Sequence, residues 1–550
     1  MLNAGIPPTL PEALVADTRH VVGDAVDFDA MRTLGDIARY QAQHRPGTVA
    51  LSFEGRETDY ETFDRHTTQV ANKLLDQGVS KGFRIAYIGK NSDYFYEILF
   101  GAAKIGAVMT SIGWRLAPAE MAYMLEDSGA VLLFAGPEVE VQVREALQLV
   151  RHPVEVVALE PGGVSSVLFE VWRSQGSPQD VDFRPSEEDV VLQLYTSGTT
   201  GRPKGAMLAH RSILSLRRAA SKAGLNWSAW KPDDISLAAM PVFHVGGCVW
   251  GVIGLFNGAK SVVVREFDPR KVLDFIEQHD ISKIFMVPSA LRIVVNEPRA
   301  RQVDFSRLRY IVYGSSPMPL DLLRQCMDVF GCGFCQTYGL TETCGTIVYL
   351  PPEDHDRSGN RRMRSAGIPM PGVEIKVVDE QGRTLPPGAV GEIMTRSEAN
   401  MAGYWGMPEA TARTLDPEGW LRTGDAGYMD EDGYLYISDR IKDMIISGAE
   451  NIYPAEIETV IRDHPAVADV AVIGVPDERW GEAVKAVVVR HPGAAADASE
   501  IIAFAKSRMA SFKAPKSVDF VDALPRNAAG KILRRELREP YWIGFERRVN

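Results

Sequence analysis

Short apolar runs and amphipathic segments alternate along most of the chain. Residues 59–78 place Phe63, Val70, Leu74 and Leu75 on one face at helical spacing, which predicts a helix. Residues 84–89 predict a buried strand, and residues 94–109 predict another helix. Further strands are predicted at residues 131–134, 155–159, 190–195, 283–287 and 309–313. Strands separated by helices indicate an α/β fold with mostly parallel sheets covered on both faces.

The pattern changes in the last third of the chain. Residues 373–439 contain short strands separated by Gly-rich and Pro-rich turns, which predicts a β-rich subdomain. Beyond it, helices are expected at 454–463 and 500–509 and strands at 467–474 and 483–490, as in a small α+β unit. We therefore expect a large N-terminal domain, residues 1–440, and a C-terminal domain, residues 441–550.

Length and charge narrow the classes of function. A chain of 550 residues is several times a usual domain, so a single small binding module is excluded. The formal charge of −12 opposes indiscriminate binding to nucleic acid or anionic lipid. Five cysteines, an odd number, fit a reducing cytoplasm better than a disulfide framework. The Cys332 and Cys335 pair lacks the partners of a zinc site, and we interpret both as small buried thiols.

Neither a secretory signal nor a membrane span is expected. The first twenty residues have no basic start followed by an apolar run. The longest stretch without charged residues, 235–259, contains Pro241, His244 and Asn257, and it predicts a strand end, a turn and a buried helix. Residence in the cytoplasm follows, while peripheral membrane contact stays open.

The most informative motif follows the apolar strand at 190–194 and reads Tyr-Thr-Ser-Gly-Thr-Thr-Gly-Arg-Pro-Lys-Gly over residues 195–205. Its hydroxyls, glycines and lysine form a loop suited to wrapping a polyphosphate. The spacing is wrong for a Walker A loop, because Pro203 stands five residues after Gly198 and Gly205 follows Lys204. The loop residues are Thr196, Ser197, Gly198, Thr199, Thr200, Gly201 and Lys204.

This motif resembles the signature of the adenylate-forming (AMP-binding) superfamily, which includes acyl-CoA synthetases, peptide-synthetase adenylation domains and luciferases. Further motifs of that superfamily follow in order at 313–317, 336–342 and 420–425. The resemblance implies a slot for adenine at Gly314, Ser315 and Ser316, where the two serines replace the commoner Gly-Ala pair. It implies nucleotide contacts from Gln336, Thr337, Tyr338, Gly339 and Thr341, a Mg²⁺ ligand in Glu342 and a ribose-binding carboxylate in Asp425.

The C-terminal region resembles the mobile lid domain of the same superfamily. The segment 438–451 is similar to its hinge and entry, with Arg440 toward ribose or phosphate and Lys442 as the pivot. Ser447, Gly448 and Ala449 would then line a path for coenzyme A, with Ala449 replacing a common glycine. The segment 525–531 resembles the last signature, whose lysine, here Lys531, enters the site during adenylation.

Substrate choice is expected in the large domain. The segment 241–247 resembles the acyl-site segment of the superfamily, where His244 is similar to a histidine or aromatic residue near the carboxylate. Its lining would be small and apolar, which favours a hydrophobic acid over acetate or an amino acid. The expected acyl-site residues are His244, Val245, Gly246, Gly247, Met286, Val287, Gly314 and Cys344.

The resemblance implies an ATP-dependent acid–CoA ligase that uses Mg²⁺, ATP and coenzyme A. A carboxylate attacks the α-phosphorus of ATP, pyrophosphate leaves, and a thiol then displaces AMP from the acyl-adenylate. The expected catalytic groups are Lys531, Thr196, Thr341, Glu342 and Lys204. A medium- or long-chain fatty acid is the expected substrate; an aryl-acid CoA ligase of benzoate or hydroxycinnamate type and a fatty-acyl-AMP ligase that loads a carrier protein are the alternatives. The pattern leaves the oligomeric state, a homodimer included, open.

Overall fold

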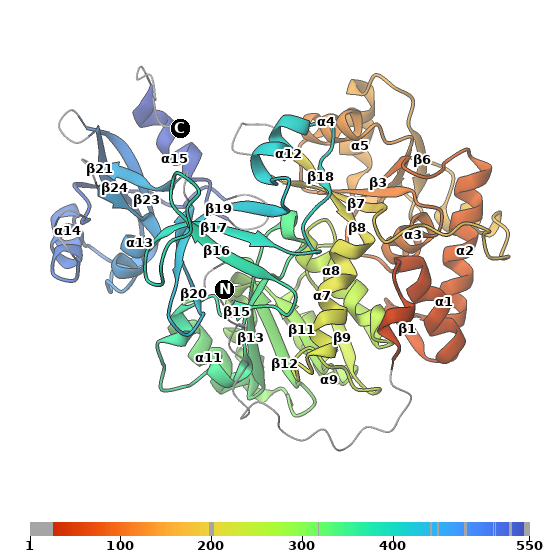
Figure 1. Ribbon diagram of the computed structural model, residues 1–550, viewed down its shortest axis with the longest axis horizontal. Helices are drawn as coiled ribbons and strands as arrows, with labels where there is room; N and C mark the ends of the chain where they lie inside the picture. The colour runs from red at the N-terminus through yellow and green to blue at the C-terminus, as the bar shows by residue number, and fades with distance from the viewer. Residues whose placement is uncertain are drawn as a thin grey trace, which may run out of the picture.

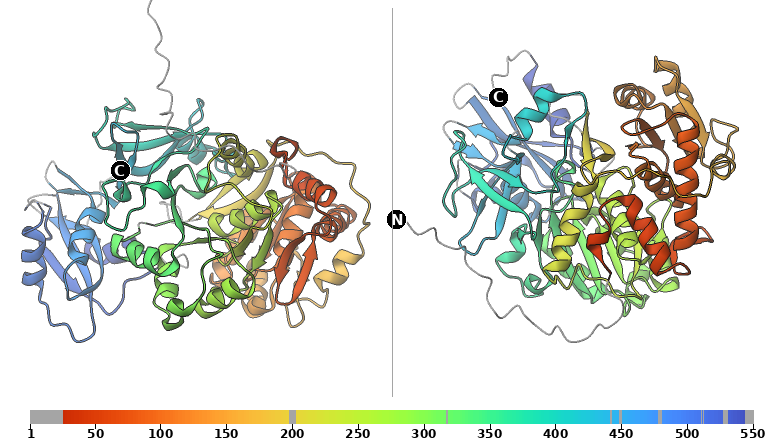
Figure 2. Two further views of the ribbon diagram at one scale, coloured as in Figure 1. Left: turned by 90° about the horizontal axis from the view of Figure 1, so that it is seen from below. Right: turned by 45° about the vertical axis from the view of Figure 1, so that its right-hand side comes forward.

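The structure is a computed structural model, and it describes residues 26–196, 203–316, 318–440, 443–447, 450–477, 481–509, 511, 513–526 and 531–543. The α/β fold expected from the sequence is confirmed. Two large sheets with their helices form the N-terminal part, a smaller β-subdomain adjoins them, and a C-terminal α+β unit completes the chain. The C-terminal unit (blue) and the first helices and strands of the described chain (red to orange) lie at opposite ends of the long axis (Figures 1 and 2).

The first large sheet carries the phosphate-loop motif at one of its strand ends. It has seven strands in the order β18-β8-β7-β4-β3-β5-β6, of which β7, β4, β3, β5 and β6 run parallel. The antiparallel β8 and β18 extend the sheet beside β7. The strands are β3 (Arg84–Ile88), β4 (Val108–Ile112), β5 (Leu132–Ala135), β6 (Glu155–Ala158), β7 (Val190–Thr196), β8 (Lys204–Ala209) and β18 (Gly403–Tyr404).

The second large sheet carries the expected adenine and acyl motifs. It has nine strands in the order β15-β14-β13-β12-β11-β9-β10-β1-β2, parallel from β13 through to β1. The strands are β1 (Val49–Phe53), β2 (Arg56–Asp59), β9 (Ile235–Ala238), β10 (Lys260–Val263), β11 (Lys283–Met286), β12 (Tyr310–Gly314), β13 (Gly333–Tyr338), β14 (Val348–Leu350) and β15 (Ile368–Pro369).

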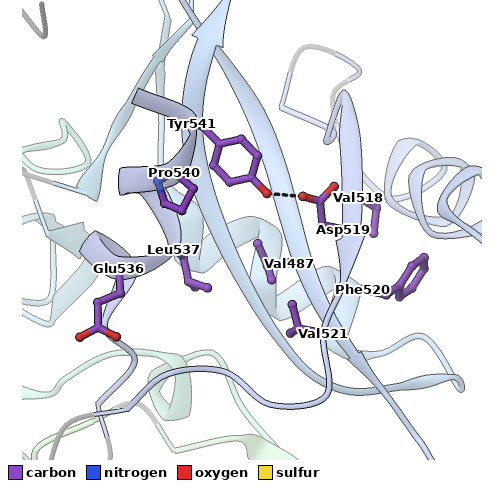
Figure 3. Close-up of a pocket in the computed structure, with 9 residues that line it drawn as sticks. All are labelled: Val487, Val518, Asp519, Phe520, Val521, Glu536, Leu537, Pro540 and Tyr541. Atoms are coloured by element: carbon purple, nitrogen blue, oxygen red, sulfur yellow. Dashed lines mark hydrogen bonds between the residues drawn. The ribbon is translucent and has the colours of Figure 1, made fainter. Parts of the chain in front are cut away.

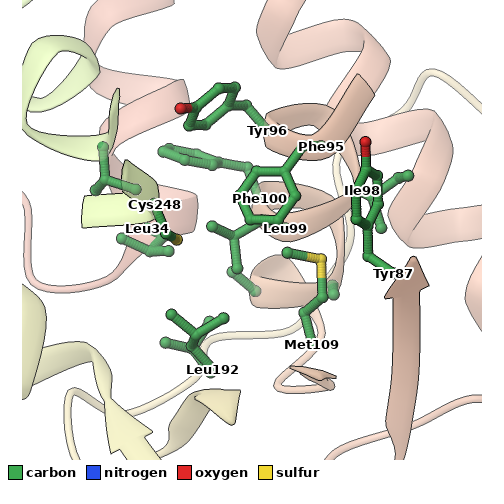
Figure 4. Packing of buried hydrophobic residues seen from close by; sticks show 14 of the residues in the cluster. Leu34, Tyr87, Phe95, Tyr96, Ile98, Leu99, Phe100, Met109, Leu192 and Cys248 are labelled. Carbon is green, nitrogen blue, oxygen red and sulfur yellow. The ribbon is translucent and has the colours of Figure 1, made fainter. Parts of the chain in front are cut away.

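Helices cover these sheets and bury the core of the N-terminal part. Every residue of α3 (Asp93–Lys104) is buried, and a Cβ added at Gly101 would lie 2.5 Å from Val70 of α2 (Tyr60–Asp76), so glycine is what permits this close approach. Phe95, Phe100 and Met109 lie in the core between the two sheets (Figure 4). The other helices are α1 (Leu34–His44), α4 (Pro118–Ser128), α5 (Glu140–Leu149), α6 (Phe169–Ser174), α7 (His210–Lys222), α8 (Val245–Phe256), α9 (Pro269–Gln278), α10 (Pro288–Val295) and α11 (Leu320–Phe330).

A four-stranded antiparallel sheet forms the β-subdomain. Its order is β16-β17-β19-β20, with β16 (Glu374–Val378), β17 (Gly391–Arg396), β19 (Trp420–Met429) and β20 (Leu435–Arg440). The strand β18 and the helix α12 (Pro408–Thr414) lie between β17 and β19 in sequence, but β18 pairs with β8 of the first large sheet. The subdomain therefore has a direct backbone connection to the strand that follows the phosphate loop.

The C-terminal unit has its own sheet and core. Its strands are β21 (Ile445–Ser447), β22 (Glu450–Ile452), β23 (Val467–Asp477), β24 (Gly481–Arg490) and β25 (Ser517–Phe520), and its helices are α13 (Pro454–Arg462), α14 (Ala498–Lys506) and α15 (Arg534–Trp542). A hollow of about 560 Å³ lies between β24, β25 and α15, where Tyr541 donates a hydrogen bond to Asp519 (Figure 3). None of the expected site residues lines it.

Three predicted segments differ from the structure by three or more residues at one end. The helix predicted at 94–109 stops at Lys104, because Gly106 adopts φ +70° and turns the chain into β4. The strand predicted at 467–474 continues to Asp477, and the helix predicted at 500–509 is α14, which ends at Lys506. Among the described residues, no helix is long and apolar enough to cross a bilayer. All five cysteines are free; Cys332 is half-buried and the other four are buried.

Candidate functional site

The two strands that flank the phosphate loop bring Thr196 and Lys204 together. They end β7 and begin β8, and they are direct partners in the antiparallel ladder. The loop residues between them, Ser197, Gly198, Thr199, Thr200 and Gly201, lie outside the described residues. The ladder therefore places a hydroxyl and a cation opposite each other at the base of the loop.

Glu342 contacts Thr196 from a short helical turn, η5 (Thr341–Thr343), and its charge acts on Lys204. The Thr196 hydroxyl donates to Glu342 Oε1 over 3.3 Å, and the Tyr404 hydroxyl donates to the same oxygen over 2.8 Å. Two donors on one oxygen hold the carboxylate in a fixed orientation. Among the described residues nothing donates to Oε2, so this oxygen is available to a ligand. No cluster of three metal-binding side chains occurs in the described part of the chain, and one carboxylate fits a Mg²⁺ ion whose other ligands are phosphates and waters.

Tyr404 is a site residue that the sequence analysis missed. Its strand pairs with β8, with Tyr404 opposite Ala206, and its ring lies 4.2 Å from Lys204 Nζ. The Met401 amide donates to the Glu342 carbonyl over 2.8 Å, so the segment is joined to both halves of the site. Burial lowers the pKa of Lys204, while the carboxylate of Glu342 opposes this shift. A tyrosine within the Gly-Tyr-Trp-Gly run at 403–406 was the available signal.

The expected adenine slot lies where β12 and β13 end side by side. Gly314 is the ladder partner of Thr337, and a Cβ added at Gly314 would lie 2.3 Å from the Thr337 carbonyl oxygen, so only glycine fits there. The next residue, Ser315, adopts φ +70°, and Ser316 is exposed beside it. The side-chain amide of Gln336 donates to the Ser365 carbonyl over 3.0 Å. This hydrogen bond ties the end of β13 to the segment around Ser365.

A buried carboxylate adjoins the same strand end. Tyr338 donates its hydroxyl proton to Asp425 Oδ2 over 2.6 Å, and Asp425 is 4% exposed. The ladder between β19 and β20 places the backbone of Arg440 opposite Asp425. Gly339 follows Tyr338, and a Cβ there would overlap the Gly345 carbonyl oxygen at 1.3 Å. The strand end and the turn that carries Thr341 and Glu342 are therefore packed without space between them.

His244 caps the start of α8 in an apolar setting. Its ring packs on Phe243 with centroids 4.5 Å apart, and its buried Nε2 has no hydrogen-bond partner among the described residues. Burial first, then the charges of Lys531 and Arg115, lower the pKa of His244 to about 4. At neutral pH the imidazole is therefore uncharged.

The glycines after His244 allow the chain to approach its neighbours closely. A Cβ at Gly246 would lie 2.7 Å from the Phe285 ring, and one at Gly247 would lie 2.2 Å from the Pro241 carbonyl oxygen. Met286 is buried at the end of β11, and Val287 caps α10. Val245 and the buried Cys344 belong to one apolar cluster, and burial raises the pKa of the Cys344 thiol to about 12. These expected acyl-site residues thus lie at the carboxyl ends of the strands, as do the nucleotide motifs.

The C-terminal unit reaches this region through Lys531. This lysine is exposed and follows the undescribed residues 527–530, and an antiparallel bridge joins Arg526 to Ile532. Its charge acts on His244, nearly three hundred residues earlier in the chain. Of the other C-terminal candidates, Ser447 ends β21 opposite Gly481, while Lys442, Gly448 and Ala449 lie outside the described residues.

Comparison with known proteins gives consistent matches over nearly the whole chain. Residues 38–405 match the family described as AMP-binding enzyme, and residues 456–531 match the AMP-binding enzyme C-terminal domain. A fatty acid–[acyl-carrier-protein] ligase, ScoC, of Streptomyces coeruleorubidus is 45% identical over 96% of this chain and 100% of its own. A feruloyl-CoA synthase of an Amycolatopsis species is 37% identical over 92% of this chain and 99% of its own.

Solved structures match as well. The crystal structure of ATP-bound MatB from Rhodopseudomonas palustris superposes with a TM-score of 0.82 at 31% identity, covering 92% of this chain and 99% of that one. A Mycobacterium tuberculosis fatty acyl CoA synthetase matches with a TM-score of 0.73 at 33% identity, covering 93% and 99%.

Proposed function

The chain belongs to the AMP-binding enzyme family, and from that membership we propose that it activates a hydrophobic carboxylic acid, a medium- or long-chain fatty acid, with ATP and transfers it to a thiol. The family assignment makes it an adenylate-forming acid–thiol ligase. The observation that carries the residue roles is the contact of Thr196 with Glu342, since it joins two nucleotide motifs that lie 146 residues apart.

In the first half-reaction, a carboxylate oxygen of the acid attacks the α-phosphorus of ATP, and the bond to the bridging oxygen of pyrophosphate breaks. The acid is already ionised at neutral pH, so no general base is required. The barrier is mostly repulsion between anions, and fixed positive charge lowers it. Lys204 and Lys531 would supply cations, and the donors on Glu342 Oε1 leave Oε2 to face the nucleotide in this proposal. Mg²⁺ bound by Glu342 and the phosphates would add further neutralising charge.

In the second half-reaction, a thiolate attacks the acyl carbonyl, and the bond to the AMP oxygen breaks. We assign the Thr341 hydroxyl to the α-phosphate and the Tyr338–Asp425 pair to the adenosine. The neutral His244 would lie beside the acid, where its Nε2 has hydrogen-bonding capacity to offer. Domain alternation about Lys442 would remove Lys531 and bring the segment around Ser447, Gly448 and Ala449 to the thiol path, with residues 1–440 and 441–550 as the two moving parts.

The apolar lining around Gly246, Met286 and Cys344 supports a hydrophobic acid. The names of the relatives support the same class, because they include fatty-acid ligases. A feruloyl-CoA synthase at 37% identity keeps an aryl acid as the alternative.

A carrier-protein thiol is a second candidate for the acceptor. It is favoured by one observation, the 45% identity to a protein named as a fatty acid–[acyl-carrier-protein] ligase. Coenzyme A is favoured by the names of several other relatives, at 37% identity and below.

The test is a panel of fatty and aryl acids in a pyrophosphate-release assay, followed by analysis of thioester products with coenzyme A and with a pantetheinylated carrier protein. We expect AMP and pyrophosphate with fatty acids, and the thioester identifies the acceptor. Failure of every acid to release pyrophosphate would contradict the proposal. Faster turnover of aryl acids would replace the fatty acid by the aryl alternative.

A further inference from the structure

A second cavity lies inside the N-terminal part, beside the helix α8 that begins at the expected acyl-site residues. It has a volume of about 210 Å³ and is bounded by the end of α7, the loop 225–232, α8 and the strands β11 and β12. Its apolar walls include Trp230, Trp250, Ile253, Phe256 and Val312.

The charged residues of this cavity are all cations. Arg45, Arg217, Lys231 and Lys283 line it, and no Asp or Glu does. A space with this lining would attract an anion, provided that at least one of the cations is not already used. The four residues differ in this respect.

Lys283 is already occupied. Its Nζ donates to the Trp227 carbonyl over 3.0 Å and to the Ala229 carbonyl, and it lies 4.6 Å from the Trp230 ring. Burial lowers the pKa of Lys283 to about 7. Lys231 is exposed at the margin, and Arg45 donates to the Gly258 carbonyl.

Arg217 is not occupied. Its Nε is buried without a hydrogen-bond partner, and no described residue forms an ion pair with it. The groups that act on its charge are Cys335 and Cys344, and burial raises the pKa of both thiols far above neutrality, so neither provides an anion. The buried Trp227 Nε1 in the same wall also lacks an acceptor. By contrast, Arg218, the residue after Arg217 in the sequence, forms an ion pair with Glu187 at 3.1 Å.

The cavity and the expected acyl site are both bordered by α8, although none of the expected acyl-site residues lines the cavity. Gly246, Trp250 and Ile253 follow one face of α8, and seven residues of helix span about 10 Å. Phe285 contacts the Gly246 position, and its ring centroid lies 6.1 Å from that of Trp250, which lines the cavity. Arg217 lies close enough to Cys344 for their electrostatics to couple.

We propose that this cavity binds the far end of the acid substrate, and that this end carries a second carboxylate held by the Arg217 guanidinium and the Trp227 indole N–H. The proposal rests on the proposed function and specifies its substrate as a dicarboxylic acid with an apolar middle. A guanidinium binds a carboxylate through two parallel hydrogen bonds, so one ligand group would satisfy the half-buried Arg217 and its buried Nε. A methyl-ended acid would leave this Nε without a partner.

The test compares acids of equal length that differ only at the far end. Methyl-ended acids from hexanoate to dodecanoate are assayed beside the corresponding dicarboxylates and ω-hydroxy acids, by pyrophosphate release, with wild type, Arg217→Met and the control Arg218→Met. We expect the best dicarboxylate to exceed its methyl-ended partner about tenfold in kcat/KM. Arg217→Met should remove this preference through KM, and Arg218→Met should retain it.

Thermal melting of both variants shows whether each is folded, and Arg217→Gln provides a second neutral replacement if Arg217→Met does not fold. A wild-type preference for methyl-ended acids, or a preference for ω-hydroxy acids alone, would overturn the proposal. So would a dicarboxylate preference that survives in both Arg217→Met and Arg217→Gln. Activity with methyl-ended acids would leave the ligase function standing in each of these cases. Absence of pyrophosphate release with every acid would instead refute the ligase function itself.

Discussion

The candidate site has a nucleotide end, around Glu342 and Asp425, and an acid end, around His244 and Arg217. The two ends differ in whether their polar side chains have hydrogen-bond partners. At the nucleotide end, side chains from separate elements already satisfy one another, as in Thr196 and Tyr404 on Glu342 and Tyr338 on Asp425. At the acid end, His244 Nε2, Arg217 Nε and Trp227 Nε1 are buried without partners among the described residues. A buried polar group without a hydrogen-bond partner destabilises the folded state, so its presence needs a physical reason. The contrast fits the proposed function, in which nucleotide-binding side chains are already paired and the acid would supply partners for these three groups.

The strongest way to break this comparison is to remove the cation that reaches the site from the C-terminal unit. Lys531→Ala should slow adenylate formation by about 10²–10³-fold, because one fixed stabiliser of the charge that develops is lost. Thioester formation from supplied acyl-adenylate should change little. Single-turnover assays of the two halves measure this, with the exposed Lys506→Ala on α14 as control. Equal losses in both halves would refute the assignment of Lys531 to adenylation.

Neutralising the carboxylate tests whether the nucleotide end works through charge. Glu342→Gln preserves an oxygen that Thr196 and Tyr404 can reach but removes the charge that binds a hard cation. We expect kcat to fall about a hundredfold and the Mg²⁺ requirement to rise. Titration of pyrophosphate release with Mg²⁺ measures both effects, and Glu398→Gln, an exposed carboxylate, should behave as wild type. An unchanged Mg²⁺ dependence would exclude Glu342 as the ligand.

The buried His244 imidazole, which lacks a hydrogen-bond partner at Nε2 among the described residues, should make the free energy of unfolding depend on pH. The folded pKa of His244, about 4, lies below its ordinary value of 6.5. Between these values the unfolded chain binds a proton that the folded chain refuses, so stability falls as the pH drops through this window. His244→Phe should therefore reduce the loss of unfolding free energy between pH 7 and pH 5 by about 2 kcal/mol.

Denaturant unfolding at both pH values measures this difference, with the exposed His491→Phe as control. The same loss in wild type and His244→Phe would show that the imidazole gains a partner or a proton in the folded enzyme.

The smallest effect concerns one donor at the nucleotide end. Tyr404→Phe removes the 2.8 Å hydrogen bond to Glu342 and leaves the Thr196 donor in place. A hydrogen bond to a charged group contributes about 1.5–3 kcal/mol at most, and the remaining donor shares its role, so we expect kcat to fall about tenfold. Steady-state kinetics with Tyr436→Phe, a buried tyrosine of the β-subdomain that is not among the site residues, provide the comparison. A kcat equal to that of wild type would show that Thr196 alone orients the carboxylate.

The motifs of the nucleotide end could be recognised in the sequence, whereas the partners of their side chains depend on the fold. Both nucleotide motifs could be found by their resemblance to the superfamily, but the contact of Thr196 with Glu342 joins the end of β7 to the turn after β13, in two different sheets, and it depends on how those sheets pack. The role of Tyr404 depends on β18 leaving its own subdomain to pair with β8, which no local periodicity encodes. Gly106 likewise ended a helix through its positive φ.

Arg217 shows the limit most clearly. On the helical pattern of α7 it is one of two adjacent arginines, and nothing in the sequence separates them. Only the fold gives Arg218 a carboxylate and Arg217 a cavity. The presence of a partner depends on tertiary packing, so an unpaired charge cannot be read from spacing.

The burial of Cys344 affects whether its thiol can react with an acyl-adenylate. An acyl-adenylate is a reactive electrophile, and any ionised thiol beside it would capture the acyl group and inactivate the enzyme in a single turnover. With a pKa raised to about 12, only roughly one Cys344 thiol in 10⁵ is ionised at pH 7. If the acid lies in the proposed acyl site, this sulfur would stand beside it almost wholly as the thiol and would compete little with the incoming acceptor.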